Sequence, residues 1–417
     1  MPVLSHNTDL HHPILLTVTA TTLDHRMTPT ERRASNSLSG LFALRMLGLF
    51  LVLPVFALEA AHYPGGNDTA RVGLAMGVYG LMQAFLQIPM GAASDRWGRK
   101  PVMLVGLAVF ALGSFIAASA STLDGLLIGR AVQGAGAISA AITALLADLT
   151  RPTVRTKGMA MVGISIAAMF ALSLLISPSL TSWVGLHGLF AITGVLAIGG
   201  MVAVVSVVPP EPPRSQIQAP LQHLSAVLRR PQLLRLDWGV FSLHAVQVAM
   251  WLGVPALLVA AGLPRAQHWH VYLPALVVSV LILGGVLFRL ERKGHMKGVM
   301  LFCIGLLALV QLGLVWAAHT HAGVASLGVL LFGFFLAFNA LEASQPSLAS
   351  KMAPASERGS ALGVFNTSQA LGFFVGGAAG GAILQHGGAD WLYACCAVAL
   401  LVWWWVARGL DLTQAKH

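Results

Sequence analysis

Charged side chains inside long apolar runs are the residues of this sequence best placed to do chemistry. Arg45, Glu59, Arg130 and Glu342 each lie within such a run. A charge at the centre of a membrane-spanning helix costs about 2.5 to 3.5 kcal/mol on insertion scales, so it normally faces a polar passage or a partner. These residues predict a path through a membrane for a solute or an ion, with Glu59 and Glu342 as candidate proton acceptors.

Two of these positions leave alternatives open. Glu59 lies near the end of its run, so it is a proton acceptor, a partner of Arg130, or a residue that meets water at the membrane surface. Arg45 and Glu342 lie at similar depths in different runs, which allows them to line one passage from opposite sides.

Polar side chains recur at about four-residue spacing in several of the apolar runs, which places them on single helical faces. Such a face can contact a solute. The alternative is hydrogen bonding between helices, worth about 0.6 kcal/mol per contact on average. The candidate solute-binding residues are Arg45, Tyr79, Gln83, Gln133, His244, Gln247, Trp251, Asn339 and Asn366.

Patterns for enzymatic catalysis, cofactor binding or metal binding are missing from the sequence. No paired acidic motif, nucleophile with a base, or GxxxxGK[ST] phosphate loop is present, so we expect neither an enzyme nor direct use of ATP. The three cysteines form no CxxC pair, and the histidines near the predicted loops lack a ligand spacing and are interpreted as solvated: His268, His270, His319, His321 and His386. A membrane sensor would need an output domain, and the tails and linker are too short for one.

The elements that must position these residues are membrane-spanning helices. Hydrophobic residues make up 56% of the 417, and 10% are charged, against roughly 25% charged in soluble domains. A bilayer needs about 20 apolar residues per helix. The sequence therefore predicts an all-α polytopic protein with twelve spans, at residues 38–61, 72–93, 102–121, 125–147, 158–180, 187–208, 236–261, 269–288, 298–318, 324–348, 360–384 and 390–407.

Basic residues set the predicted orientation. Of the 25 Lys and Arg residues, 21 lie in the tails, the linker and alternate loops on one side. The positive-inside rule places that side, with both termini, in the cytoplasm. The same asymmetry explains the net charge of +10 without nucleic-acid binding. We expect a monomer in the cell membrane, which is the inner membrane in a Gram-negative bacterium.

The spans are predicted to form two six-helix halves. A PPEPP segment opens a linker at residues 209–235 and cannot continue a helix. Pro54 and Pro255 are 201 residues apart, as are Lys157 and Arg358, which indicates an internal duplication. The predicted parts are a tail (1–37), a first bundle (38–208), the linker, a second bundle (236–408) and a tail (409–417).

The turn GAASDRWGRKP, residues 91–101, concentrates charge between two spans. Its glycines permit a tight turn and a close helix approach. Its charges can hold helical ends together, and Asp148 is positioned to accept Arg99. We predict a conformational latch made of Gly91, Asp95, Arg96, Gly98, Arg99, Lys100 and Asp148.

This turn completes the GxxxDRxGRK motif of the major facilitator superfamily of transporters, which the sequence resembles. Arg130, Gln133 and Gly134 match a second motif of that family, in its fourth helix. The resemblance implies that Arg130 takes part in proton-linked transport. It also implies that Asp95 meets the start of the eleventh span, near Ser360, in the outward-facing state.

More narrowly, the segments ALRMLGLFLVLPV, ADLTRPTVRTKGMA and GVFNTSQALG resemble the YajR group of bacterial transporters. Because the sequence stops at His417, we expect it to lack the small soluble C-terminal domain of that group's best-known member. The resemblance implies alternating access with proton-coupled efflux, an antiport, of a small drug-like solute. The family's antiporter motif has Gly before Pro in the fifth span, where this chain has Ser177 before Pro178, so proton-coupled uptake of a sugar or another nutrient is the alternative.

Overall fold

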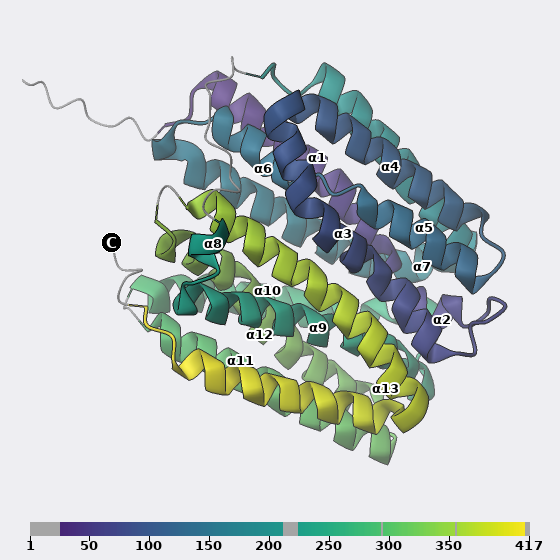
Figure 1. Cartoon of the computed structure of the whole chain (residues 1–417). Coiled ribbons are helices and arrows are strands. Elements are labelled where there is room, and N and C mark those ends of the chain that lie inside the picture. The colour runs from purple at the N-terminus through teal and green to yellow at the C-terminus, as the bar shows by residue number, and fades with distance from the viewer. Residues whose placement is uncertain (1–25, 212–223, 293–294, 355–356, 413–417) are drawn as a thin grey trace, which may run out of the picture.

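The described part of the chain is helical throughout, joined by short turns (Figure 1). The computed structural model describes residues 26–211, 224–292, 295–354 and 357–412. Ten of its helical segments are long and apolar enough to cross a membrane. Two of these, α7 (Pro152–Ser206) and α13 (Arg358–Arg408), are 55 and 51 residues long, more than twice the roughly 20 residues that a bilayer needs.

A single glycine divides each long helix into two spans. Gly185 in α7 has φ 65° and Gly388 in α13 has φ 74°, a left-handed conformation that glycine adopts without steric cost. The chain turns back at each glycine, so ten segments make twelve spans. The two turns lie 203 residues apart, close to the offset of the sequence repeat, and the predicted all-α, twelve-span fold is confirmed.

The helices form two groups, with α1–α7 above and α8–α13 below in Figure 1. The upper group, called the first half, also contains α1 (Pro29–Val52), α2 (Phe56–Ala60), α3 (Thr69–Trp97), α4 (Arg99–Ser119), α5 (Leu123–Ala135) and α6 (Ser139–Asp148). The second half contains α8 (Leu224–Val227), α9 (Pro231–Ala260), η2 (Arg265–Gln267), α10 (Trp269–Arg292), α11 (Met296–Thr320) and α12 (Val324–Met352), followed by α13. Residues 1–25, 212–223 and 413–417 of the predicted tails and linker lie outside the described residues.

Two spans of the first half are interrupted. The first span breaks between α1 and α2 at Pro54, which has no backbone N–H to donate. Val55 donates its backbone N–H to Val52, and the carbonyl of Leu51, just before the break, accepts from the Ser177 hydroxyl of α7. The residue that departs from the family's Gly-Pro pair thus satisfies a carbonyl near the broken helix end. The fourth span breaks between α5 and α6 at Gly136.

The halves meet most closely along α3 and α13, which lie side by side in Figure 1. A Cβ added at Gly73 would lie 2.2 Å from the carbonyl oxygen of Gly377, and one at Gly377 would lie 2.5 Å from that of Gly73. Thr69 donates its backbone N–H to the Gln385 side chain at 2.7 Å. We call this end of the bundle, with the turn at residues 61–68, the far end.

The other end, called the basic end, contains the turn at Gly98 and both ends of the described chain. Here the halves separate. A Cβ on Gly359 or Gly363 of α13 would meet no atom of the described residues within 4 Å, and one on Gly91 of α3 would meet only Ala140 of its own half. The structure is therefore closed at the far end and opens toward the basic end.

Candidate functional site

Arg45 is buried among three helices of the first half. Its side chain comes from α1 and is 2% exposed. One terminal nitrogen donates to the Ser139 hydroxyl of α6 at 3.0 Å, and the other donates to the Tyr79 hydroxyl of α3 at 2.8 Å. The Phe110 ring lies 5.8 Å from the guanidinium carbon. Arg45 and Tyr79, both predicted to contact solute, are therefore in direct contact.

Arg130 contacts the ring of Tyr79, whereas Arg45 contacts its hydroxyl. It is 5% exposed, and its guanidinium carbon lies 4.8 Å from the centre of the Tyr79 ring. Its terminal nitrogens donate to the Gln133 side chain at 2.6 Å and to the Met76 carbonyl at 3.4 Å. Gln133 in turn donates to Ser114 of α4 at 2.9 Å. Four predicted residues from three spans thus form one network.

The second half contributes a titratable cluster. His244 of α9, which is 2% exposed, places Nε2 at 3.2 Å from a carboxylate oxygen of Glu342 of α12. The Gln369 amide of α13 lies 2.8 Å from the same nitrogen. Nδ1 lies 2.8 Å from the Val240 carbonyl, which fixes the ring orientation because only a protonated Nδ1 can donate there. The Glu342 side chain is 38% exposed.

Glu342 lies on the face of the second half that is directed toward the first. Phe335, seven residues earlier on α12, shares its helical face. The Phe335 ring packs against Phe170 of α7 with centroids 6.3 Å apart. His244 is further enclosed by Phe338 and Phe373 at 5.9 and 4.9 Å. The contact between His244 and Glu342, with an apolar surround, thus lies near the boundary between the halves.

The remaining predicted solute-binding residues do not join either network. Gln83 and Asn366 are half-buried, and Gln247 is buried. Asn339 donates to Ser279 of α10 at 3.3 Å, a contact between helices. Trp251 is fully buried in the core of the second half, with its ring edge against Tyr272 at 5.2 Å.

At the basic end, Arg99 is the centre of the charged turn. It pairs with Asp95, donates to Asp148 at 3.2 Å and donates to the Ser94 hydroxyl at 2.7 Å. Gly98 has φ 110°, which requires glycine between α3 and α4. The contact with Asp148 expected from the sequence is observed. The ion pair of Asp95 stays within the first half, in a structure that opens at this end.

The linker adds a contact that the sequence analysis missed. Glu211 accepts the backbone N–H groups of Arg99, at 3.1 Å, and of Lys100 at the start of α4. A carboxylate at a helix N-terminus is favourable because it meets the unpaired N–H groups and the positive end of the helix dipole. Lys100 also donates to the Val208 carbonyl at 2.7 Å. The charged turn is thus tied to the segment that joins the halves.

At the far end, Glu59 pairs with Arg265 of η2 at 2.8 Å, so it joins the two halves and does not pair with Arg130 in this structure. A pocket of about 380 Å³ opens beside this ion pair. Burial and the charge of Glu59 raise the pKa of Tyr63 to about 12, which keeps its hydroxyl protonated. His268, interpreted from sequence as solvated, is 2% exposed, so that interpretation is wrong.

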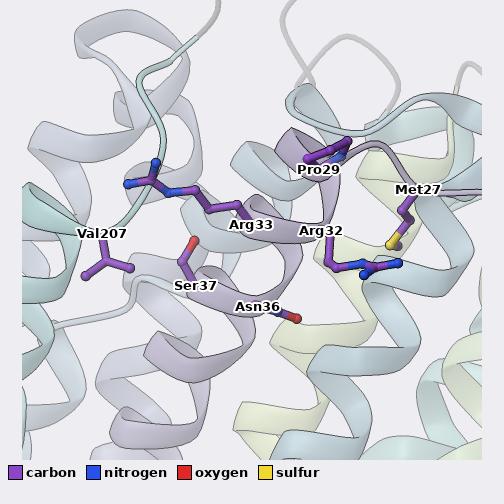
Figure 2. Close-up of a pocket in the computed structure, with 7 residues that line it drawn as sticks. All are labelled: Met27, Pro29, Arg32, Arg33, Asn36, Ser37 and Val207. Atoms are coloured by element: carbon purple, nitrogen blue, oxygen red, sulfur yellow. The ribbon is translucent and has the colours of Figure 1, made fainter.

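A second pocket, of about 580 Å³, lies at the start of α1 (Figure 2). Arg32 and Arg33 line it, but both are exposed and extend in opposite directions in Figure 2. The pocket therefore does not bring its charges together on one ligand. The described residues also hold no group of three or more His, Cys, Asp or Glu side chains placed to bind a metal ion.

Two six-helix halves around buried charges define a polytopic membrane transporter. The chain belongs to the Major Facilitator Superfamily, which residues 38–377 match, and within it to the YajR-like group. Over 363 residues it is 43% identical to the inner membrane transport protein YajR of Escherichia coli K12, covering 86% of this chain and 79% of the relative. It is 27% identical to the multidrug resistance protein MdtH of Yersinia enterocolitica, covering 84% of each.

Solved structures support the same fold. The nucleoside transporter NupG matches with a TM-score of 0.70 and 17% identity, covering 90% of this chain and 98% of NupG. The human organic anion transporter MFSD10 matches with a TM-score of 0.66 and 20% identity, covering 91% of this chain and all of MFSD10. The family and fold expected from the sequence are confirmed, and the chain is a multi-pass protein of the cell membrane.

Proposed function

We propose that the chain is a secondary active transporter that moves a small solute by alternating access and couples that movement to protons, in the direction of efflux. The observation that carries the proposal is the contact between His244 and Glu342. At 3.2 Å the imidazole nitrogen and the carboxylate oxygen lie close enough for one proton to pass between them.

Gln369 fits both the protonated and the deprotonated imidazole nitrogen. Its amide carries an NH₂ donor and a carbonyl acceptor, so it donates to a bare Nε2 and, after a half-turn, accepts from a protonated one. The cluster can therefore gain and lose a proton without leaving a buried polar atom unsatisfied. The 38% exposure of the Glu342 side chain gives the proton a route to water.

Rocking of the halves supplies the transport step. Closure at the far end and separation at the basic end describe one of the two states that alternating access requires. The glycine contacts of α3 with α13 must part, and the basic end must close, to reach the other state. Efflux is favoured by the similarity to multidrug resistance proteins. Ser177 in place of the family's glycine weakens the antiport interpretation, so uptake is the alternative.

Proton flux in vesicles tests this proposal. The protein is reconstituted with pyranine, a pH-sensing dye, trapped inside, and organic anions, neutral compounds and cations are added outside. A solute that enters by antiport expels protons and alkalinises the lumen, whereas symport acidifies it. Asp124→Asn, which removes a carboxylate paired with Arg71 at the surface, serves as the control and should behave as wild type. If no compound moves protons faster than in protein-free vesicles, proton coupling is wrong.

A further inference from the structure

We propose that Arg45 and Arg130 form the binding site for an anionic group, so that the transported solute carries a carboxylate, sulfonate or phosphate. The proposal rests on the transport function proposed above and names the class of solute. It follows from three features of the first half: the burial of two charges, the absence of a counter-charge among the described residues, and a free donor edge on each guanidinium.

The arginines at the helix ends of this chain contact carboxylates, whereas the two buried arginines do not. Burial normally makes a partner of opposite charge more important. Arginines at the helix ends contact carboxylates: Arg71, Arg99, Arg151, Arg230 and Arg265. Arg45 and Arg130 are 2% and 5% exposed, yet within the described residues no carboxylate oxygen lies within 4.0 Å of either. A buried ion is costly unless an opposite charge compensates it. The described first half therefore retains two positive charges that lack a resident partner.

The hydrogen bonds of both arginines leave the same part of each side chain open. Arg45 uses its two terminal nitrogens on Ser139 and Tyr79, and Arg130 uses its own on Gln133 and Met76. The Nε atom of each is buried and has no partner among the described residues. A guanidinium has five N–H donors in a fixed plane, and the edge with Nε matches two oxygens of a carboxylate or phosphate. Neutral partners thus fix the orientation of each guanidinium, while its Nε–H has no partner among the described residues.

Tyr79 brings the two charges to one place. Its hydroxyl accepts from Arg45 and its ring lies 4.8 Å from the guanidinium carbon of Arg130, so both cations contact one aromatic side chain. Their fields add in a region of low dielectric, which attracts an anion and repels a cation. Glu342 lies on the second half in contact with His244, and it makes no ion pair with either arginine in the described structure.

Binding to the purified full-length protein, with no pH gradient, tests the site directly. The probes are benzoate, benzenesulfonate and phenyl phosphate, compared with neutral benzamide and cationic benzylamine. The inorganic source of negative charge is tested by titrating sodium chloride alone. We expect at least one organic anion to bind about tenfold more tightly than benzamide or benzylamine, and to lose about tenfold in Arg45→Gln or Arg130→Gln.

Matched variants separate binding from folding. Arg71→Gln removes an exposed arginine and should leave anion affinity unchanged. If an Arg→Gln variant fails to fold, Tyr79→Phe, which keeps the ring and deletes the acceptor of Arg45, should still weaken anion binding. Equal affinity for anionic, neutral and cationic probes, binding of chloride alone, or no binding of any anion each overturns the proposal.

The outcome is distinct from that of the proton-flux experiment. Arginine-dependent anion binding without proton movement would leave this site standing and remove the coupling mechanism. Proton-coupled transport restricted to neutral or cationic solutes would support the coupling mechanism and contradict the proposed anion site.

Discussion

The spans that carry Arg45 and Arg130 in the first half are broken at Pro54 and Gly136, whereas α9 and α12 of the second half run unbroken, although each contains a proline. The broken spans carry two arginines, Arg45 and Arg130, and the unbroken spans carry His244 and Glu342. Yet each half ends in the same device, a long helix folded back on one glycine. The two halves share a topology and differ in chemistry.

This difference suggests a division of roles between the halves. Arginine stays protonated at any physiological pH, so the charge of the first half is constant. The second half instead carries a histidine and a carboxylate in contact, His244 and Glu342 at 3.2 Å, which are side chains of the types that accept and release protons. We infer that a constant positive site holds the solute while the opposing titratable site responds to the proton gradient.

Among the substitutions that test this division of roles, Glu342→Gln should have the largest effect. An amide cannot carry the proton, so accumulation driven by a pH gradient should fall by about 5- to 150-fold, the usual range of a coupling free energy. Exchange of labelled for unlabelled solute, which needs no net proton movement, should persist. Parallel flux and exchange assays in proteoliposomes measure both. Equal loss of exchange and of driven uptake would show that Glu342 holds solute, which contradicts the assigned roles.

Tyr79→Phe tests the role assigned to the first half. The substitution removes the hydroxyl that accepts from Arg45 and keeps the ring beside Arg130. A hydrogen bond to a charged group is worth about 1.5 to 3 kcal/mol, so the free energy of unfolding should fall by about that amount. The proton-dependent step should keep its pH profile, because His244 and Glu342 are untouched. A shifted pH profile with unchanged stability would reverse the assignment of the halves.

Gly377→Ala probes the surface that both halves share. The new methyl group would lie 2.5 Å from the Gly73 carbonyl oxygen, and overpacking of this kind costs about 1 to 3 kcal/mol. The far end should open, seen as a longer distance between spin labels at residues 67 and 386. Gly363→Ala, on the same helix with no described atom within 4 Å, is the control. The idea fails if both alanines leave the distance unchanged.

The fold was predictable because hydropathy and glycine or proline signals are local. Twelve apolar runs can be counted along the sequence between charge and turn signals, and the spacing of Pro54 and Pro255 indicated the duplication. The sequence does not reveal that the fifth and sixth spans are joined by a turn at the single residue Gly185, since the residues around it resemble an ordinary loop boundary. The proline of α9 also leaves its helix intact, so the prolines alone do not predict which spans break.

The candidate site was only partly predictable, because its contacts join residues that are far apart in the sequence. Arg45, Tyr79 and Arg130 could be selected individually as polar residues in apolar runs, but their contact depends on how three helices pack. Arg265 gave no signal as the partner of Glu59, because the two are 206 residues apart and in different halves. Glu211 stood in a proline-rich linker that predicts only a chain break. Helical spacing selects faces, and tertiary packing decides which faces meet.

The ion pair between Glu59 and Arg265 should have the smallest effect. It joins the halves at the far end, but its side chains are 23% and 48% exposed, and such pairs are worth about 0 to 1 kcal/mol. Glu59→Gln should therefore open the far end slightly, with less lengthening of the 67 to 386 distance than Gly377→Ala gives. The exchanged pair, Glu59→Arg with Arg265→Glu, should restore the wild-type distance. A full opening in Glu59→Gln would mean that charge, rather than the close glycine contact of α3 with α13, holds the halves together. The exchanged pair, which restores the ion pair but has no carboxylate at position 59, would then distinguish closure of the far end from proton uptake by Glu59.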